Sequence, residues 1–466
     1  MKPAFHPVEW ACLKALRAAL WLGCGAIPFA CRADAEAAKP YGLEAPPTVK
    51  AGLLLPERDK GALPALLSRT GAFQDTARLA PAGALIPYDI NVPFWSDGAA
   101  KSRWMAMPGG NTTAAGKIEF RPTGEWSFPK GTVFVKHFEL GTDDTRPEVK
   151  RRLETRLLVC DADGGVYGAA YKWRPDNSDA DLLATNLTET IVIKTAAGTR
   201  TQMWYYPSRQ DCLVCHTAKA GLVLGVKTRQ MNRDFTYPSG RADNQLRVWN
   251  HLGLFDPPLE EARLPDYARL ASADDPSRSL EERAKSYLDA NCAHCHRPGG
   301  TVAYFDARYD TPLRQQNLIA GQILIDEGID GARAIAPHDI WRSLIYMRAS
   351  SLDAIKMPQL AHNATDEQGM RLLRQWIESM PGPPVLPPPE ISPPQGHYEQ
   401  PVEVTLKEAE PGASVRYTLD GSLPTSDDPL YGKPIRLDGS AILRAKAFKP
   451  GFTKSITVQQ VFIIGD

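Results

Sequence analysis

The pattern Cys-x-x-Cys-His occurs twice in this chain of 466 residues and constrains it more than any other feature. Residues 212–216 read Cys-Leu-Val-Cys-His, and residues 292–296 read Cys-Ala-His-Cys-His. The spacing places the two thiols of a motif about one helical turn apart, so both can bond the vinyl groups of one porphyrin. The histidine that follows then faces the iron. The sequence therefore predicts two covalently bound c-type haems, attached through Cys212, Cys215, Cys292 and Cys295, with His216 and His296 as proximal iron ligands.

A pair of disulfides or a Cys/His zinc site is the alternative interpretation. A zinc site also uses thiolates and imidazoles, but it does not require a histidine directly after each second cysteine. A disulfide within each motif would leave both histidines unexplained. The haem interpretation accounts for all three residues of each motif, so we favour it.

The first 33 residues have the character of a secretion signal. A basic start is followed by an apolar run, residues 18–30, that is too short to span a bilayer, and then by small residues. This predicts export to the periplasm or the cell surface, where bacterial c-type haem is attached. Cys24 and Cys31 leave a lipid anchor open as an alternative, and an uncleaved membrane anchor is another. The formal charge is zero and there is no basic stripe, which argues against nucleic-acid binding.

The remaining pattern predicts a multidomain protein. Residues 131–140, 152–160 and 166–173 alternate with the period of strands, while capping boxes at residues 279–282 and 365–368 begin helices. We expect four parts after the signal: a mostly β domain with the first haem at 42–265, an α-helical cytochrome c domain with the second haem at 270–382, a Pro-rich linker at 383–389, and a C-terminal β-sandwich at 390–466.

Met357 is the predicted distal ligand of the second iron. It follows His296 by about 60 residues on an expected loop, and Pro358 stiffens the backbone that presents it. A thioether ligand favours Fe(II) and raises the potential, which suits electron transfer. Packing of Met357 in a core is the alternative, with Met347 as the reserve ligand.

The distal ligand of the first iron is less defined by the sequence. His137 shares a strand face with two valines, where an imidazole without a partner would be costly. We favour His137 over Met231, and Met203 and His251 are further candidates. The alternatives are a buried, hydrogen-bonded His137 and an open iron that meets peroxide. Residues 86–99 read as a loop packed over the β core, with contact between Asp97 and a haem propionate as the other interpretation.

Resemblances in two regions of the chain, one around the motifs and a second at the C-terminus, extend these expectations. Residues 88–104, 130–140, 151–159 and 212–232 resemble a family of exported bacterial dihaem c-type cytochromes of undefined role. That likeness implies electron transfer with haems at the two motifs, and its members often have leucine where this chain has Met231. Residues 279–380 are similar to class I cytochrome c, with Met357 at the distal position.

The second resemblance lies at the C-terminus. Residues 390–466 resemble the immunoglobulin-like C-terminal domain of chitobiases and hexosaminidases, through a signature hairpin at residues 416–425. In those enzymes the domain is an accessory module, so it implies no sugar hydrolysis.

Together these features predict an electron carrier rather than a catalyst. It would pass electrons between a periplasmic donor, such as a quinoprotein-like dehydrogenase, and a respiratory acceptor, so its partners are redox proteins. One alternative is a redox enzyme, such as a peroxidase, that uses an open first haem. Another is a cell-surface polymer-binding protein with accessory haems, although no residue of the C-terminal domain supports carbohydrate binding by itself.

Overall fold

A six-stranded antiparallel sheet organises the N-terminal half of the computed structural model, which describes residues 40–45, 53–108, 116–301, 304–408 and 410–465. The strands lie in the order β3 (Ile86–Tyr88), β4 (Ala100–Ala106), β6 (Val133–Gly141), β7 (Lys150–Cys160), β8 (Val166–Trp173) and β9 (Ala180–Leu182). The strands predicted from the alternating pattern are confirmed.

The two faces of this sheet differ in character. Side chains alternate along β6, so Val133, Val135 and His137 face one way and Phe134 and Lys136 face the other. The first face packs into an apolar core with residues of β7 and β8. The second face borders the segments that carry the first Cys-x-x-Cys-His motif.

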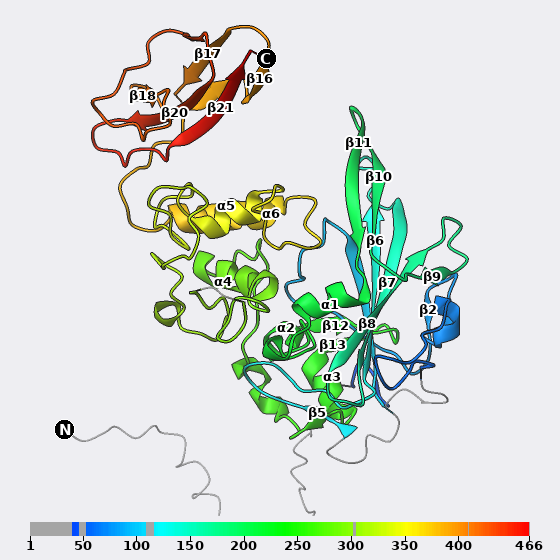
Figure 1. Ribbon diagram of the computed structural model, residues 1–466. Coiled ribbons are helices and arrows are strands. Elements are labelled where there is room, and N and C mark those ends of the chain that lie inside the picture. The colour runs from blue at the N-terminus through cyan, green and yellow to red at the C-terminus, as the bar shows by residue number, and fades with distance from the viewer. Residues whose placement is uncertain (1–39, 46–52, 109–115, 302–303, 409, 466) are drawn as a thin grey trace, which may run out of the picture. The chain divides into compact units, whose positions relative to one another are not determined.

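Shorter elements surround the sheet. Figure 1 shows β10 (Leu187–Thr195) and β11 (Gly198–Tyr206) as a long antiparallel ribbon. The small strand pairs are β1 (Phe73–Asp75) with β2 (Ala80–Pro81), β12 (Asp234–Thr236) with β13 (Ala242–Asn244), and β14 (Phe255–Asp256) with β5 (Ile118–Glu119). Three α-helices lie in the same region: α1 (Arg209–Cys215), α2 (Thr228–Met231) and α3 (Gln245–His251). The short 3₁₀ helices are η1 (Leu67–Thr70), η3 (Ala218–Ala220), η4 (Glu261–Asp266) and η5 (Leu313–Gln315).

The expected α-helical cytochrome c domain at residues 270–382 is wrong, and the corrected fold class is mostly β. Of the described residues, 30% lie in strands and 16% in helices. Within the expected domain, α-helix is confined to α4 (Leu280–Asn291), α5 (Leu344–Ser350) and α6 (Glu367–Glu378). The described residues between Cys292 and Ser343 are turns, loops and isolated bridges apart from the single 3₁₀ turn of η5. The capping signals correctly place the starts of α4 and α6, but the segment between them is too irregular to form a helical domain.

This loop-rich segment also belongs to the same compact unit as the sheet, because residues from Tyr41 to Asp466 cluster together. The predicted secretion signal lies outside the described residues. None of the helices among the residues described has the length and apolar character needed to cross a bilayer.

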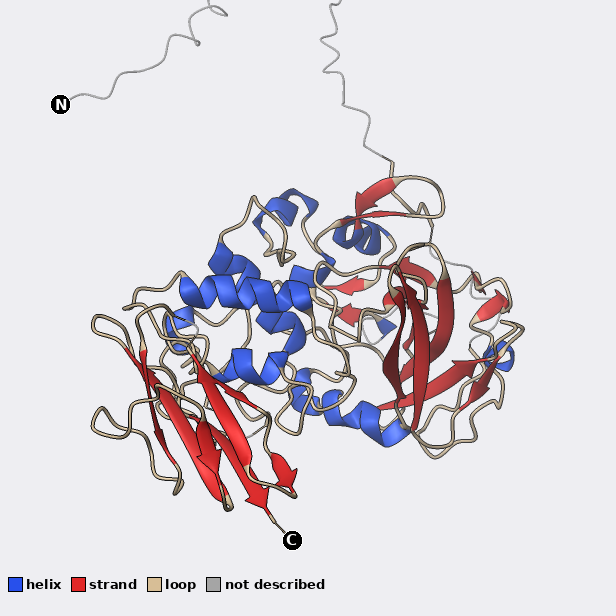
Figure 2. Cartoon of the chain, turned by 90° about the horizontal axis from the view of Figure 1, so that it is seen from above, coloured by secondary structure: helices blue, strands red, loops and turns tan. Residues whose placement is uncertain are grey.

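The C-terminal region forms the expected β-sandwich, and Figure 2 shows its strands gathered together. One sheet holds β15 (Glu390–Ser392), β17 (Val402–Lys407) and β19 (Ile435–Leu437), and the other holds β16 (Gly396–Tyr398), β21 (Val458–Ile464), β20 (Ala441–Phe448) and β18 (Ser414–Thr418). Asp330 of the loop-rich segment accepts bonds from Lys446 Nζ at 2.7 Å and from the Thr457 N–H at 3.1 Å. These bonds fasten the sandwich to the preceding segment.

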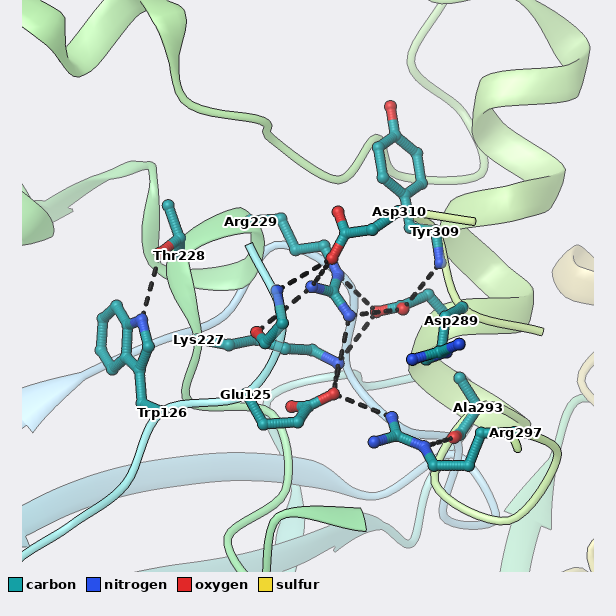
Figure 3. Close-up of polar contacts among 12 residues, drawn as sticks. Glu125, Trp126, Lys227, Thr228, Arg229, Asp289, Ala293, Arg297, Tyr309 and Asp310 are labelled. Carbon is teal, nitrogen blue, oxygen red and sulfur yellow. Dashed lines mark hydrogen bonds and ion pairs between the residues drawn. The ribbon is translucent and has the colours of Figure 1, made fainter. Parts of the chain in front are cut away.

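A buried ion network joins helix α4 to the segment that follows the first motif (Figure 3). Arg229 of α2 donates to both carboxylate oxygens of Asp289 in α4, at 2.8 and 3.1 Å. Lys227 Nζ lies 3.1 Å from the same carboxylate, and Arg229 also bonds Asp310 at 2.6 Å. Burial by itself would raise the pKa of Asp289, but Lys227 and Arg229 outweigh it and hold that pKa well below its usual range.

We predict that Asp289→Asn destabilises the protein strongly. Asp289 and Arg229 are 0% and 2% exposed, and removing one partner of a buried pair costs about 3–5 kcal/mol because the other charge is left uncompensated. Asp181→Asn is the matched control, since its pair with Arg174 is exposed and is worth only ~0–1 kcal/mol. Denaturant midpoints measure both changes. Equal midpoints for the two variants would contradict a structural role for the network.

Candidate cofactor site

Helix α1 carries the two thiols of the first motif and begins at a capping box. The Ser208 hydroxyl accepts a bond from the Asp211 N–H at 3.2 Å, and Asp211 Oδ2 accepts one from the Ser208 N–H at 2.8 Å. The helix then places Cys212 and Cys215 one turn apart, both free thiols and both partly exposed. The spacing seen in the sequence is therefore realised as a helical turn.

Helix α1 approaches strand β8 so closely that only glycine fits beneath it. A Cβ atom built on Gly168 would lie 2.5 Å from Cys212 Sγ, much closer than real carbon–sulfur contacts. Gly168 thus lets the sheet support the first cysteine directly.

His216 ends the first motif with one ring nitrogen bonded and the other available. Its Nδ1–H donates to the Leu222 carbonyl oxygen at 2.6 Å, which fixes the ring and leaves the lone pair of Nε2 for a metal. Burial lowers the pKa of His216 to about 4, so the imidazole is neutral. A neutral, oriented imidazole is the form that binds iron.

A cavity of about 200 Å³ opens beside this histidine. Cys212, Cys215 and His216 line one part of it, and the second face of the sheet lines another through Lys136 and Arg156. Residues of the second motif and its helix complete the wall, including Asp289, His294 and Arg297. The two motifs, far apart in sequence, therefore meet at one cavity.

The wall of the cavity carries an excess of positive charge. Five of its lining side chains are basic and three are acidic, which leaves a surplus of two positive charges; these residues are Arg103, Lys136, Arg156, Lys227 and Arg297, against Glu125, Asp211 and Asp289.

Lys136 stands out in this set. Its ammonium group makes no ion pair or hydrogen bond with any residue that the structure describes, and it lies 5.1 Å from the centre of the Phe138 ring. Burial, together with the nearby charges of Lys101, Arg103 and Arg156, holds the pKa of Lys136 well below its usual range. An anion in the cavity would supply the missing counter-charge.

The second motif is built less regularly. Cys292 ends helix α4, and Cys295 and His296 follow in a turn. The ring of His296 stacks on Phe305 with the centroids 4.3 Å apart, and its buried Nδ1 has no hydrogen-bond partner in the described residues. Burial lowers the pKa of His296 to about 4, so this imidazole is also neutral.

The thiols of the two motifs are neighbours. The pKa of Cys215 is raised and that of Cys295 is lowered, in each case chiefly by the hydrogen bond between the two side chains. Arg297 Nη1 donates to the Lys219 carbonyl at 3.0 Å, which fastens the end of the second motif to the residues just after the first.

Met357 is half-buried in the loop after α5, as the sequence predicts. Its N–H donates to the Arg348 carbonyl at 2.9 Å, and the charge of Arg348 acts on His296. Met357 and His296 therefore share Arg348 as a neighbour.

His362 lies in the same loop and was missed by the sequence reasoning. It is 2% exposed, its Nδ1 is unpaired in the described structure, and the backbone of Met357 packs against it. Asp97 closes this loop by accepting bonds from the N–H groups of Asn363 at 2.7 Å and Ala364 at 3.0 Å. The only sequence signal was a histidine five residues after Met357.

The structure places the four candidate ligands of the first iron away from the cavity. His137 is on the opposite face of the sheet, where Nδ1 lies 2.9 Å from Thr155 Oγ1 and the ring meets Trp173 edge-on. Met231 is fully buried in an apolar core, Met203 is half-exposed on the ribbon, and His251 stacks on Tyr41.

Among the residues described, no group of three or more His, Cys, Asp and Glu side chains is spaced to hold a metal ion. A haem iron takes its four equatorial ligands from the porphyrin, so this finding does not test haem binding. Cys160 is a buried free thiol, and burial raises its pKa to about 12.

Comparison with known proteins identifies the C-terminal region alone. Residues 393–459 match the chitobiase/beta-hexosaminidase C-terminal domain family, which agrees with the sandwich of β15 to β21. Comparison of the chain with curated proteins and with solved structures gave no match. The C-terminal part is thus a domain of this accessory type, and the match does not extend to the two motifs.

Proposed function

We propose that the protein is an exported c-type cytochrome that binds two haems covalently and transfers electrons. The observation that carries this proposal is the environment of His216. A neutral imidazole with a fixed Nδ1 stands beside two free thiols one helical turn apart, at the wall of a cavity. This is the donor set that covalent haem attachment needs.

The charge of the cavity fits the same group. Arg103 and Arg156 of the lining are paired with Asp89 and Glu154, which lie outside it, whereas Lys136 has no carboxylate partner in the described structure. A buried cation without a counter-ion is costly, so a haem propionate bound at Lys136 would offset its desolvation.

The second haem would be held by Cys292, Cys295 and His296, with Met357 as its distal ligand. Phe305 orients the proximal ring by stacking on it, and Asp97 holds the loop that presents Met357. Bound haem supplies one-electron chemistry at the iron; the residues named here attach it, orient it and exclude water. The partners would be an exported electron donor and a respiratory acceptor.

We predict that the mature protein carries two covalently bound haems. Intact mass and haem staining on a denaturing gel measure this after expression with a c-type haem maturation system. The double variant Cys212→Ala/Cys215→Ala should lose one haem, as should the double variant of Cys292 and Cys295, because each motif holds its own porphyrin. Cys160→Ala is the control and should keep both haems. A wild-type protein without bound haem would refute the proposed function.

We predict that Gly168→Ala impairs the first haem selectively. The added Cβ would meet Cys212 Sγ at 2.5 Å, and overpacking of this kind costs about 1–3 kcal/mol or displaces the thiol. The haem content should fall from two toward one per chain. Gly141→Ala, at the end of β6 with nothing within 4 Å of its Cβ, should leave it at two. An unchanged haem content in Gly168→Ala would mean that α1 moves freely away from β8.

We predict that Met357→Ala removes the thioether from the second iron. The long-wavelength absorption band of Met-ligated Fe(III) should disappear, and the potential of that haem should fall by on the order of 100 mV, a fraction of the range that axial ligands span. Met347→Ala, in α5, is the matched control and should keep the band. Survival of the band in Met357→Ala would show that another side chain ligates this iron.

A further inference from the structure

The second motif contributes a side chain to the cavity of the first. His294, the residue between the two cysteines that directly precedes Cys295, lines the cavity together with Cys212, Cys215 and His216. Its charge, when present, is close enough to act on His216. His294 therefore belongs to the second motif but lines the cavity beside the first.

His294 is held firmly in this position. The ring of Phe94 meets it edge-on, with centroids 5.4 Å apart. Asn291, at the end of α4, accepts a bond from the Trp95 N–H at 2.7 Å, and Arg297 bonds the carbonyl of Lys219. The segment that bears His294 is thus fixed on both sides, toward the sheet and toward the first motif.

The ring of His294 has no hydrogen-bond partner in the described structure other than the thiol of the adjacent Cys295. The ring is half-buried, and the Cys295 thiol engages only one of its two nitrogens. The lone pair of a neutral imidazole can be satisfied by a metal as well as by a hydrogen-bond donor.

Few other side chains could ligate the first iron. Of the described residues that line the cavity, Lys136, Lys227 and His294 offer an amine or imidazole nitrogen beyond the first motif itself, and Lys227 is held in ion pairs with Glu125 and Asp289. Lys136 lies among Lys101, Arg103 and Arg156, where its charge meets the need for an anion-binding wall. His294 is the remaining candidate.

We propose that His294, from within the second motif, is the distal ligand of the iron at His216. This inference rests on the proposed function and extends it, because the second motif would attach its own haem and also close the coordination of the first. The two haems would then be immediate neighbours, as the adjacent thiols of Cys215 and Cys295 also indicate. With both axial positions filled, the first iron would pass electrons without binding peroxide.

The test is the spin state of the ferric protein, recorded by absorption and electron paramagnetic resonance alongside a haem count. In His294→Ala we expect two haems, with half of the total haem converted from low to high spin, and added imidazole should restore the low-spin state. His338→Asn is the matched control, since His338 is also half-buried but bonds the Met380 carbonyl away from the cavity, and it should remain fully low-spin.

Three outcomes would overturn the proposal while leaving covalent haem attachment intact. These are two unchanged low-spin haems in His294→Ala, a high-spin haem in the wild type, and failure of imidazole to reverse the change. If His294→Ala does not retain its haems, His294→Met replaces it, and a second Met–Fe(III) band is expected; its absence would overturn the proposal. A wild-type protein without haem would instead refute the proposed function.

Discussion

The buried contact between Arg229 and Asp289 is the interaction on which the arrangement of both motifs depends. Asp289 lies three residues before Cys292, and Arg229 follows His216 by thirteen residues. A bidentate pair at 2.8 and 3.1 Å between these positions fixes the second motif against the first. Neither side chain is exposed to water. Lys227, which pairs with Asp289, and Asp310, which pairs with Arg229, therefore help to balance the buried charges. The cavity between the motifs exists because this network sets their separation.

The sequence predicted much of the secondary structure but not how the segments meet. Strand β8 runs over the same residues, 166–173, that alternate in the sequence, and the capping box at Ser279 starts α4 where it was expected. These features depend on neighbours in the chain, so local patterns reveal them. The error at residues 270–382 has the same origin. Helix signals at both ends of a segment say nothing of the loops between them, which are held by contacts with distant residues.

In the candidate site, too, the sequence predicted the features that depend on neighbours in the chain but not those that depend on contacts between distant residues. The helical turn that carries Cys212 and Cys215 was predictable because it depends on local spacing, whereas Cys295 and His296 lie in a turn beyond helix α4; haem attachment at both motifs stays a prediction. His137 was a reasonable candidate from its strand face, yet the face it shares with Val133 and Val135 turns away from the first motif. His294 could not be assigned from the sequence, because its role depends on the fold that brings residue 294 to the cavity beside residue 216. In the same way, the alternating pattern cannot distinguish Lys136 at a cavity wall from a lysine in solvent.

Electron transfer and peroxide chemistry require different axial coordination of a haem iron. A carrier keeps both axial ligands, whereas a peroxidase needs an open position. In this fold the segment that presents His294 also bears the thiols of the second motif and is fastened by Asn291, Arg297 and Asp289. Withdrawal of His294 would therefore shift the second haem and strain the buried ion network, at a cost of several kcal/mol once a buried pair is broken. If His294 ligates the first iron as proposed, the same contacts that bring the two motifs together would oppose opening of that iron, which supports the proposed carrier over the peroxidase alternative.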